Sequence, residues 1–378
     1  MENAICTSET EKPISPTVDE LEHWLREEDL DRLASLYRHA NALRARVVGN
    51  EVHLRGLLEI SNHCRRHCRY CGINATRREL RRYRMSPDEI VACAQQAARY
   101  GYGTVVMQSG EDPGITADRM ANIIRRIKET TPLAVTLSLG ERSPEDLLCW
   151  RAAGADRYLL RFETSDRALY ERIHPPPATG ETFGRFALLK VLRQLGYEVG
   201  SGVMAGLPGQ SCRSLAHDIT CFRELDLDMV GVGPYIPHPE TPLGRNRPDP
   251  LMKEAARNTQ LVTCKVLALT RLACPEANLP ATTALATLDR RQGYRHGLTC
   301  GANVIMPNIT PVRYRKLYEI YPSKICMSET PEASRQHALS LLTKLQRSAG
   351  QGRGDRIRRG ETRTMDTSAH AARAVSAS

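Results

Sequence analysis

The chain has 378 residues, a formal net charge of +10, 41% hydrophobic residues and only 5% aromatic residues. This length allows one large core, since α/β barrels of more than about 200 residues form single domains. The scarcity of aromatic residues disfavours a β-sandwich and favours the aliphatic core that fills a barrel.

The positive charge is concentrated in two segments. Residues 64–84 hold eight arginines against Glu79, and residues 344–378 hold eight Lys or Arg against three acidic residues, which leaves the rest of the chain near −2. Charge confined to one loop and one tail is not the pattern of a nucleic-acid-binding face. We therefore expect no nucleic-acid partner, whereas the basic loop could hold anionic ligands.

No run of about 18 apolar residues is present, so we expect no transmembrane helix and no membrane partner. The first twenty residues lack the basic and apolar regions of a secretory signal. We therefore expect a cytoplasmic location, in which the twelve cysteines stay reduced. Nine of them lie scattered among apolar neighbours and are interpreted as small buried hydrophobic side chains.

In chain order, residues 1–16 are polar and contain two prolines, so we expect them to be disordered. Thr17 and Glu20 then form a capping-box pattern, and apolar residues at helical spacing predict two helices over 17–50.

From residue 51, short β-branched runs alternate with amphipathic stretches of helical length. Strands are predicted at 53–61, 103–110, 133–140, 156–163, 198–206, 228–235, 277–284 and 301–308. Helices are predicted at 86–102, 118–130, 143–155, 183–197, 214–226 and 253–273. This alternation predicts an α/β fold, a (β/α)₈ TIM-type barrel over 51–345. Residues 346–378 are rich in Gly, Arg and Ser, so we expect a disordered basic tail.

Polar residues and glycines follow each predicted strand. Ordinary turns explain any one of these loops, but eight of them at the carboxyl ends of barrel strands predict an active site there.

Cys64, Cys68 and Cys71 lie within eight residues after the first predicted strand. A structural zinc site has four protein ligands, which disfavours zinc here. A redox-active cysteine pair normally lies at the start of a helix in a thioredoxin-like fold, and that context is absent. Iron–sulfur clusters normally take four cysteines, so three with no fourth nearby imply one iron that is open to a further ligand. Zinc and a redox pair remain as alternatives.

With Tyr70 as the aromatic residue before Cys71, this spacing resembles the radical S-adenosylmethionine superfamily. In that family three cysteines hold a 4Fe–4S cluster whose open iron chelates S-adenosylmethionine. One electron then cleaves the sulfonium and releases a 5′-deoxyadenosyl radical. The sequence "SGED" after the second strand resembles the family's Gly-Glu step, here Gly110 and Glu111.

Further motifs narrow the resemblance. The sequences "RRYRMSPDEIV", "VTLSLGE", "GADRYLLRFET", "GLPGQ", "DMVGVGPYIPHPETPL", "NLPATTA", "GANVIMPN" and "LYEIYPSKIC" are similar to the HydE family of FeFe-hydrogenase maturases, over residues 52–326. The resemblance implies a small, iron-bound, cysteine-derived substrate used in H-cluster maturation. Biotin synthase and methylornithine synthase share the cluster motif but match the later motifs less well.

The resemblance also implies residue roles. Cys64, Cys68 and Cys71 would hold the cluster, and the S-adenosylmethionine site would comprise Gly110, Glu111, Ser138, Glu163 and Arg185. Carboxylates suit the cofactor's cationic groups, and a guanidinium suits its carboxylate. Arg161 and Thr136 are the catalytic candidates, although a plain buried ion pair is the alternative for Arg161 and Glu163. The substrate candidates are Met229, Thr282, Thr283, Met306, Tyr318 and Tyr321, with core packing as the alternative for the methionines.

Two positions depart from the family pattern. Many members carry cysteines eight and eleven residues after the position of Cys326, and these bind a second cluster. Ser334 and His337 occupy those positions here, so we expect a single cluster. Expected partners are a small-molecule or organometallic substrate, and transiently the other hydrogenase maturation proteins and an electron donor. Two other classes remain open: a radical enzyme of amino-acid or vitamin metabolism, and a non-catalytic metal-binding scaffold.

Overall fold

The computed structural model describes residues 16–176, 183–245, 260–325 and 327–358. The strands are β1 (Glu51–Ser61), β2 (Thr104–Ser109), β3 (Ala134–Ser138), β4 (Arg157–Leu159), β5 (Glu198–Ala205), β6 (Met229–Pro234), β7 (Val304–Ile305) and β8 (Ser348–Ala349). The helices are α1 (Val18–Arg26), α2 (Leu30–Val48), α3 (Pro87–Arg99), α4 (Ala117–Thr130), α5 (Pro144–Ala152), α6 (Arg167–Ile173), α7 (Arg185–Gln194), α8 (Cys212–Glu224), α9 (Pro242–Arg245), α10 (Gln260–Ala273), α11 (Thr283–Leu288), α12 (Gly293–Thr299), α13 (Val312–Arg315) and α14 (Pro331–Lys344).

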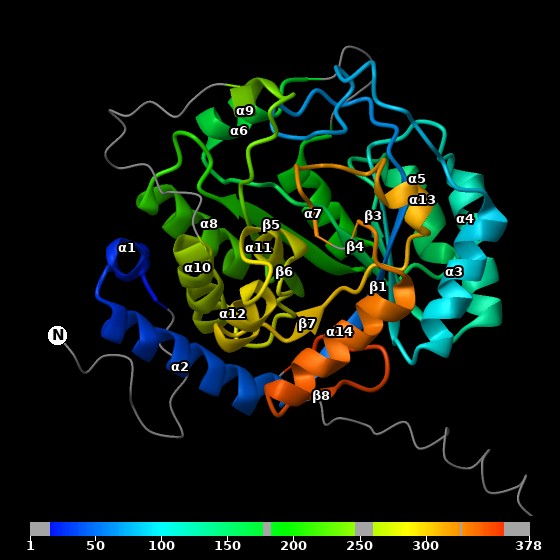
Figure 1. The fold of residues 1–378 in the computed structure, drawn as a ribbon. Coiled ribbons are helices and arrows are strands. Elements are labelled where there is room, and N and C mark those ends of the chain that lie inside the picture. Colours follow the sequence, from blue (N-terminus) through cyan, green and yellow to red (C-terminus); the bar gives the residue numbers. More distant parts are fainter. Residues whose placement is uncertain (1–15, 177–182, 246–259, 326, 359–378) are drawn as a thin grey trace, which may run out of the picture.

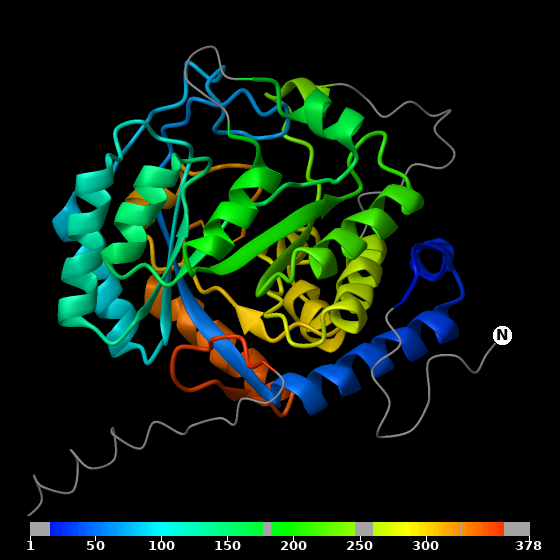
Figure 2. The ribbon, with the colours of Figure 1, turned by 180° about the vertical axis from the view of Figure 1, so that it is seen from behind.

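The sheet is parallel and curls into the predicted barrel (Figures 1 and 2). Its strand order is β6-β5-β4-β3-β2-β1-β7, and β8 pairs with the first two residues of β1, next to those that pair with β7. The predicted strand at 277–284 contributes only single parallel bridges, from Asn278 to Met229 and from Pro280 to Val304. These bridges join β6 to β7, so the fold class predicted from the alternation is confirmed.

The predicted amino-terminal helices are α1 and α2. The Thr17 side chain accepts a hydrogen bond from the backbone N–H of Glu20, whose carboxylate accepts one from the N–H of Thr17, so the capping box is formed. α1 packs against α8 and α10, and α2 packs against α10 and α12. Both helices therefore cover the outside of the barrel, and α2 crosses its lower end in Figure 1.

The tail was expected to be disordered from residue 346, and for residues 346–358 this expectation is wrong. Residues 347–358, here termed the C-terminal strap, run along the ends at which the barrel strands begin. Arg157, at the start of β4 and fully buried, pairs with Glu198 and with Asp355 of the strap. Arg356 pairs with Asp226, Asp228 and Glu276. Because these acids are scattered along the sequence, no local pattern in the tail revealed them. Residues 359–378 lie outside the described residues.

Candidate active site

The long loop after β1 carries the three cysteines and lies across the carboxyl ends of the strands, at the top of Figure 1. Asn62 is fully buried at its start and donates to the carbonyls of Arg81 (2.9 Å) and Leu317 (2.7 Å). Arg82 donates to the carbonyls of Asn62 (2.5 Å) and Ile73 (2.7 Å). The positive charge of this loop therefore serves in part to hold its own backbone in place.

Burial raises the pKa of all three cysteine thiols, and for Cys64 to about 11. The Cys68 thiol also raises the pKa of Cys64 and Cys71, whereas Arg185 and Arg66 lower the pKa of Cys68 itself. Within the described ranges, no three His, Cys, Asp or Glu side chains are grouped so that they could hold a metal ion. The loop thus brings the thiols within electrostatic range of one another without closing them around a common point.

The start of the β2–α4 loop packs directly against the cysteine loop. A Cβ atom on Gly110 would lie 2.3 Å from the carbonyl oxygen of His63 and 2.7 Å from Cβ of Cys64, so only glycine fits. The next N–H, that of Glu111, donates to the Cys64 sulfur at 3.4 Å. Such a hydrogen bond favours the thiolate that an iron–sulfur cluster requires.

Around this contact lies a network of carboxylates and guanidiniums. Glu111 forms an ion pair with Arg65 at 2.7 Å and accepts the backbone N–H of Glu141 at 2.9 Å. The carboxylate of Glu141 lies 3.4 Å from both Arg66 and Arg185. Glu141 Oε2 and Nη1 of Arg66 are buried without a hydrogen bond in the described part of the chain. Buried polar atoms without partners favour a polar ligand at this place.

A cavity of about 280 Å³ opens beside this network, lined by Arg65, Glu111, Asp112, Pro113, Glu141, Arg142, Ser143, Asp146 and Phe183. Sequence reasoning missed Glu141 and Arg66. Their signal was present, because Glu141 ends the "SLGE" stretch after β3 and Arg66 lies between two of the cysteines.

Arg161 and Glu163 lie side by side after β4 and form an ion pair at 3.1 Å. Glu163 is buried and has φ 68°, a conformation that side chains other than glycine rarely adopt. Burial raises the pKa of its carboxyl group, and the charges of Arg161 and Arg185 lower it. Arg185, the first residue of α7, donates to the backbone carbonyl of Arg161. The predicted residues Arg161 and Glu163, after β4, and Arg185, on α7, therefore lie together.

Two predicted polar side chains lie on β3. The Thr136 hydroxyl is buried without a hydrogen-bond partner among the described residues. Ser138, at the end of the strand, is half-buried opposite Gln108 of β2. Thr136 therefore presents an unused donor and acceptor, as a ligand-binding group would.

Tyr70 and His174 form a contact that the sequence did not suggest. The Tyr70 hydroxyl lies 2.9 Å from Nε2 of His174, and the rings pack edge to face. Burial, with the charges of Arg185 and Arg66, lowers the pKa of His174 well below its usual value. A neutral imidazole therefore holds the aromatic residue of the cysteine motif.

The six substrate candidates do not all meet. Tyr318 lies beside the Glu59–Lys324 pair, with the Lys324 ammonium 5.3 Å from its ring centroid. The charge of Glu59 raises the pKa of both Tyr318 and Tyr321, and the charge of Arg161 lowers that of Tyr321. Met229 lies instead at the start of β6, where its sulfur accepts a hydrogen bond from Arg55 at 3.0 Å. Met229 is therefore near the C-terminal strap and not at the carboxyl ends of the strands.

The other three substrate candidates lie around α11. Thr282 is the N-cap residue of this helix and approaches Gly233 of β6. Thr283 and Met306 line a separate cleft on the outside of β7. Tyr318 and Tyr321 therefore lie near the Glu59 carboxylate, with Arg161 close to Tyr321, whereas Met229 lies at the amino end of β6.

A buried ion pair at the barrel wall was also missed. Lys324 pairs with Glu59 of β1, with side chains 4% and 1% exposed, and its ammonium lies 5.3 Å from the ring centroid of Tyr318. Asn308 donates to the other oxygen of Glu59 at 3.2 Å. No sequence spacing connects these residues.

Comparison with known proteins decides the family. Residues 58–219 match the model of the radical SAM superfamily. The chain is 44% identical to the FeFe hydrogenase maturase subunit HydE of Thermotoga maritima over 328 residues, 87% of this chain and 90% of that protein. The chain belongs to the HydE family of the radical S-adenosylmethionine superfamily. The predicted family is therefore confirmed.

This HydE-family chain is also similar to proteins with other names. It is 30% identical to the 3-methylornithine synthase of Methanosarcina acetivorans over 76% of this chain and 78% of that protein. The crystal structure of methylornithine synthase aligns with a TM-score of 0.73 at 25% identity, covering 89% of this chain and 94% of that one. The maturase HydG aligns with a TM-score of 0.70 at 19% identity over 88% and 71%, a likeness of fold alone.

As a radical S-adenosylmethionine enzyme of the HydE family, the protein uses a 4Fe–4S cluster and S-adenosylmethionine. The residues present fit these cofactors. The Glu111 N–H faces the Cys64 sulfur, and buried oxygen and nitrogen atoms of Glu141 and Arg66 lack protein partners in the described part of the chain. Among the described helices, none has the length and apolarity needed to cross a membrane.

Proposed function

We propose that this HydE-family enzyme acts on a small, iron-bound, cysteine-derived substrate during assembly of the di-iron subcluster of FeFe-hydrogenase. The proposal is supported by 44% identity to a FeFe hydrogenase maturase across 87% of this chain. The observation that carries it is the convergence of the cysteine loop, the Glu111–Glu141 network and the Arg161–Glu163 pair at one end of the barrel.

In this proposal Cys64, Cys68 and Cys71 ligate the cluster, and the Glu111 N–H stabilises the thiolate of Cys64. The bound cofactors would supply a one-electron cleavage that generates a 5′-deoxyadenosyl radical. Glu111 and Glu141 would accept from the cationic groups of S-adenosylmethionine, and the guanidiniums of Arg66 and Arg185 would bind its carboxylate. Gly110, Ser138 and Glu163 complete the cofactor site.

Inside the barrel, Arg161 and Thr136 are the proposed catalytic residues. Arg161 would orient an anionic group of the substrate, and Thr136 would hold the substrate with the hydroxyl that has no partner in the described chain. Tyr318, Tyr321 and Thr282 would form the wall. Gly231 of β6 adds to the open space, since a Cβ atom on it would have only the carbonyl oxygen of Ser201 nearby, at 3.8 Å.

We also propose a cytoplasmic location and transient contacts with an electron donor and the other maturation proteins. The ten cysteines in the described part of the chain are all free thiols, which supports a reducing compartment. Ser334 and His337 hydrogen-bond to Glu329 at 3.0 and 3.1 Å. Cys326 lies outside the described residues, so the single cluster remains a prediction.

A second candidate function is radical chemistry on an amino acid. The 30% identity to 3-methylornithine synthase and the TM-score of 0.73 favour it over a non-catalytic scaffold. The hydrogenase function and the amino-acid function share the cofactor site and differ in the substrate, so they are distinguished by product analysis.

The test is anaerobic reconstitution with iron and sulfide, followed by S-adenosylmethionine, a strong reductant and an assay for 5′-deoxyadenosine. We expect the nucleoside with the parent protein and none with Cys68→Ala, while Cys93→Ala, a cysteine outside the loop, behaves as the parent. A cluster that binds without cleavage would support a non-catalytic scaffold. Incubation with iron-bound cysteine, or with a mixture of free amino acids, then distinguishes the two functions by which of these is consumed.

A further inference from the structure

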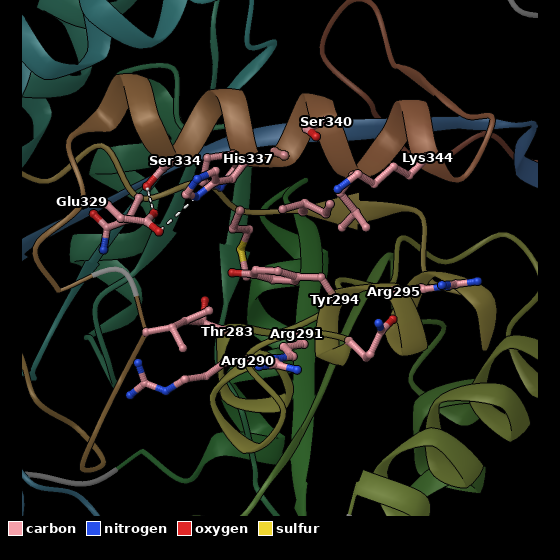
Figure 3. A pocket seen from close by; sticks show the side chains of 18 of the residues that line it. Thr283, Arg290, Arg291, Tyr294, Arg295, Glu329, Ser334, His337, Ser340 and Lys344 are labelled. Atoms are coloured by element: carbon pink, nitrogen blue, oxygen red, sulfur yellow. Dashed lines mark hydrogen bonds and ion pairs between the residues drawn. The ribbon is translucent and has the colours of Figure 1, made fainter.

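A cleft of about 470 Å³ lies on the outside of the barrel, between the α11–α12 segment, β7 and α14 (Figure 3). Its apolar surface comes from Ile305, Pro307, Ala338, Leu341 and Leu345. Tyr294 lies across the middle of the cleft (Figure 3). The volume falls within the range of about 300–1,000 Å³ that is usual for small-molecule sites.

The rim of the cleft is cationic. Arg290, Arg291, Arg295 and Lys344 line it, against Glu329 as the carboxylate in the lining. Glu329 already hydrogen-bonds to Ser334 and His337 at one end of the cleft, as the dashed lines in Figure 3 show. Its carboxylate is therefore held at that end of the cleft by two partners.

Three of these four cations are not used by the described fold, whereas Arg290 donates to the carbonyl of Ser323 at 3.1 Å. The exposed side chains of Arg291, Arg295 and Lys344 form no hydrogen bond or ion pair with any part of the chain that the structure describes. The neighbouring acid, Asp289, accepts the backbone N–H of Arg291 at 3.1 Å and lies 3.7 Å from His296. Like charges gathered around one concavity attract an anion, and an apolar floor removes water from it.

We propose that this cleft binds a small organic anion, a carboxylate with an apolar body. The guanidiniums of Arg291 and Arg295 and the ammonium of Lys344 would bind the carboxylate groups, because a guanidinium offers paired donors that match a carboxylate. Tyr294 and the aliphatic floor would contact the apolar body. This inference is independent of the proposed radical reaction and rests on the cleft alone.

The cleft adjoins the barrel interior through β7. Asn308 lines the cleft and donates to Glu59, which is paired with the buried Lys324. Met306, a predicted substrate residue, also lines the cleft. The ligand would therefore be separated from the buried Glu59–Lys324 pair by the side chains of one strand.

The experiment is calorimetric titration of the full chain with trimesate, a rigid benzene tricarboxylate, and with a neutral triol on the same ring. We expect one saturable trimesate site and no binding of the triol. The double variant Arg291→Glu, Arg295→Glu should bind at least about tenfold more weakly, since a tenfold change corresponds to about 1.4 kcal/mol.

The matched control is Arg46→Glu, Arg125→Glu, which removes two exposed cations from α2 and α4 and changes the net charge equally. This variant should bind trimesate as the parent does. Equal weakening in both double variants would show a response to net charge only and overturn the proposal, as would the absence of a saturable site. Circular dichroism of each variant confirms folding, and Lys344→Glu repeats the test from α14.

Discussion

Asp218 accepts hydrogen bonds from both the backbone N–H and the hydroxyl of Ser165, at 2.5 and 2.6 Å. Ser165 follows Glu163 by two residues, and Glu163 holds a left-handed conformation. Gln210 lies 3.4 Å from the same carboxylate and accepts the N–H of Gly206 after β5. One fully buried carboxylate on α8 therefore fixes the loops after β4 and β5, next to the proposed cofactor site.

This arrangement predicts a pH dependence of stability. Burial raises the pKa of Asp218 to about 7 from the usual value of 3.8. The folded state then keeps a proton that the unfolded state releases, so the stabilisation is complete below about pH 4 and is lost as the pH rises through about 7. Asp218→Asn cannot titrate, and its melting temperature should fall less between about pH 5 and pH 8 than that of the parent. Parallel melting curves would contradict this prediction.

Gly140→Ala should weaken S-adenosylmethionine binding. Gly140 has φ 79°, and a Cβ atom there would lie 2.8 Å from Oε2 of Glu111. Gly101 is the matched control, with φ 77° and open space around the added atom. Both alanines should cost about 1 kcal/mol through backbone strain, but only Gly140→Ala should displace Glu111. Equilibrium dialysis with labelled cofactor measures the difference, and equal affinity in both variants would argue against a role for Glu111.

The buried pair of Lys324 and Glu59 predicts a non-additive double variant. Lys324→Met leaves a carboxylate buried without its cation, which typically costs about 3–5 kcal/mol. Adding Glu59→Gln removes the charge, keeps an acceptor for Asn308, and should recover most of the loss. Urea unfolding of the parent, both single variants and the double variant tests this expectation. Additive losses would show that the two side chains act separately.

Removal of the C-terminal strap should destabilise the barrel, whereas removal of the residues after it should not. Truncation after residue 346 takes away Asp355, one of the two carboxylates paired with the fully buried Arg157. The melting temperature should fall by about 5 °C or more. Truncation after residue 358 is the control, and a comparable fall there would contradict the role given to the strap.

Much of the barrel was predictable because it repeats one unit. Each of the first six predicted strands has an observed strand within its bounds or within two residues of them, since β-branched runs and amphipathic helices are local patterns. The segment 277–284 was the exception, with bridges at Asn278 and Pro280 alone. α14 and β8 were missed, because a polar helix and a two-residue strand carry little periodic signal.

The site was predictable where a motif is contiguous. The cysteines and the Gly110–Glu111 step could be read from neighbouring residues, whereas Arg66, Glu141 and the Lys324–Glu59 pair depend on contacts between distant segments. The position of Met229 shows the converse error. Met229 is the second residue of the predicted strand 228–235, so its place at the start of the strand, away from the carboxyl ends, was readable from the sequence.

The C-terminal strap has a consequence for biosynthesis. A ribosome adds about 5–20 residues per second and releases the amino-terminal segments first. β1 would emerge long before β7, its partner around the closed ring, and before Ser348, with which Glu51 is in register. Arg157 of β4 would also lack its ion pair with Asp355, which is synthesised almost two hundred residues later. The nascent barrel would thus present an unpaired strand edge to its surroundings until translation is nearly complete, and holding chaperones would protect that edge.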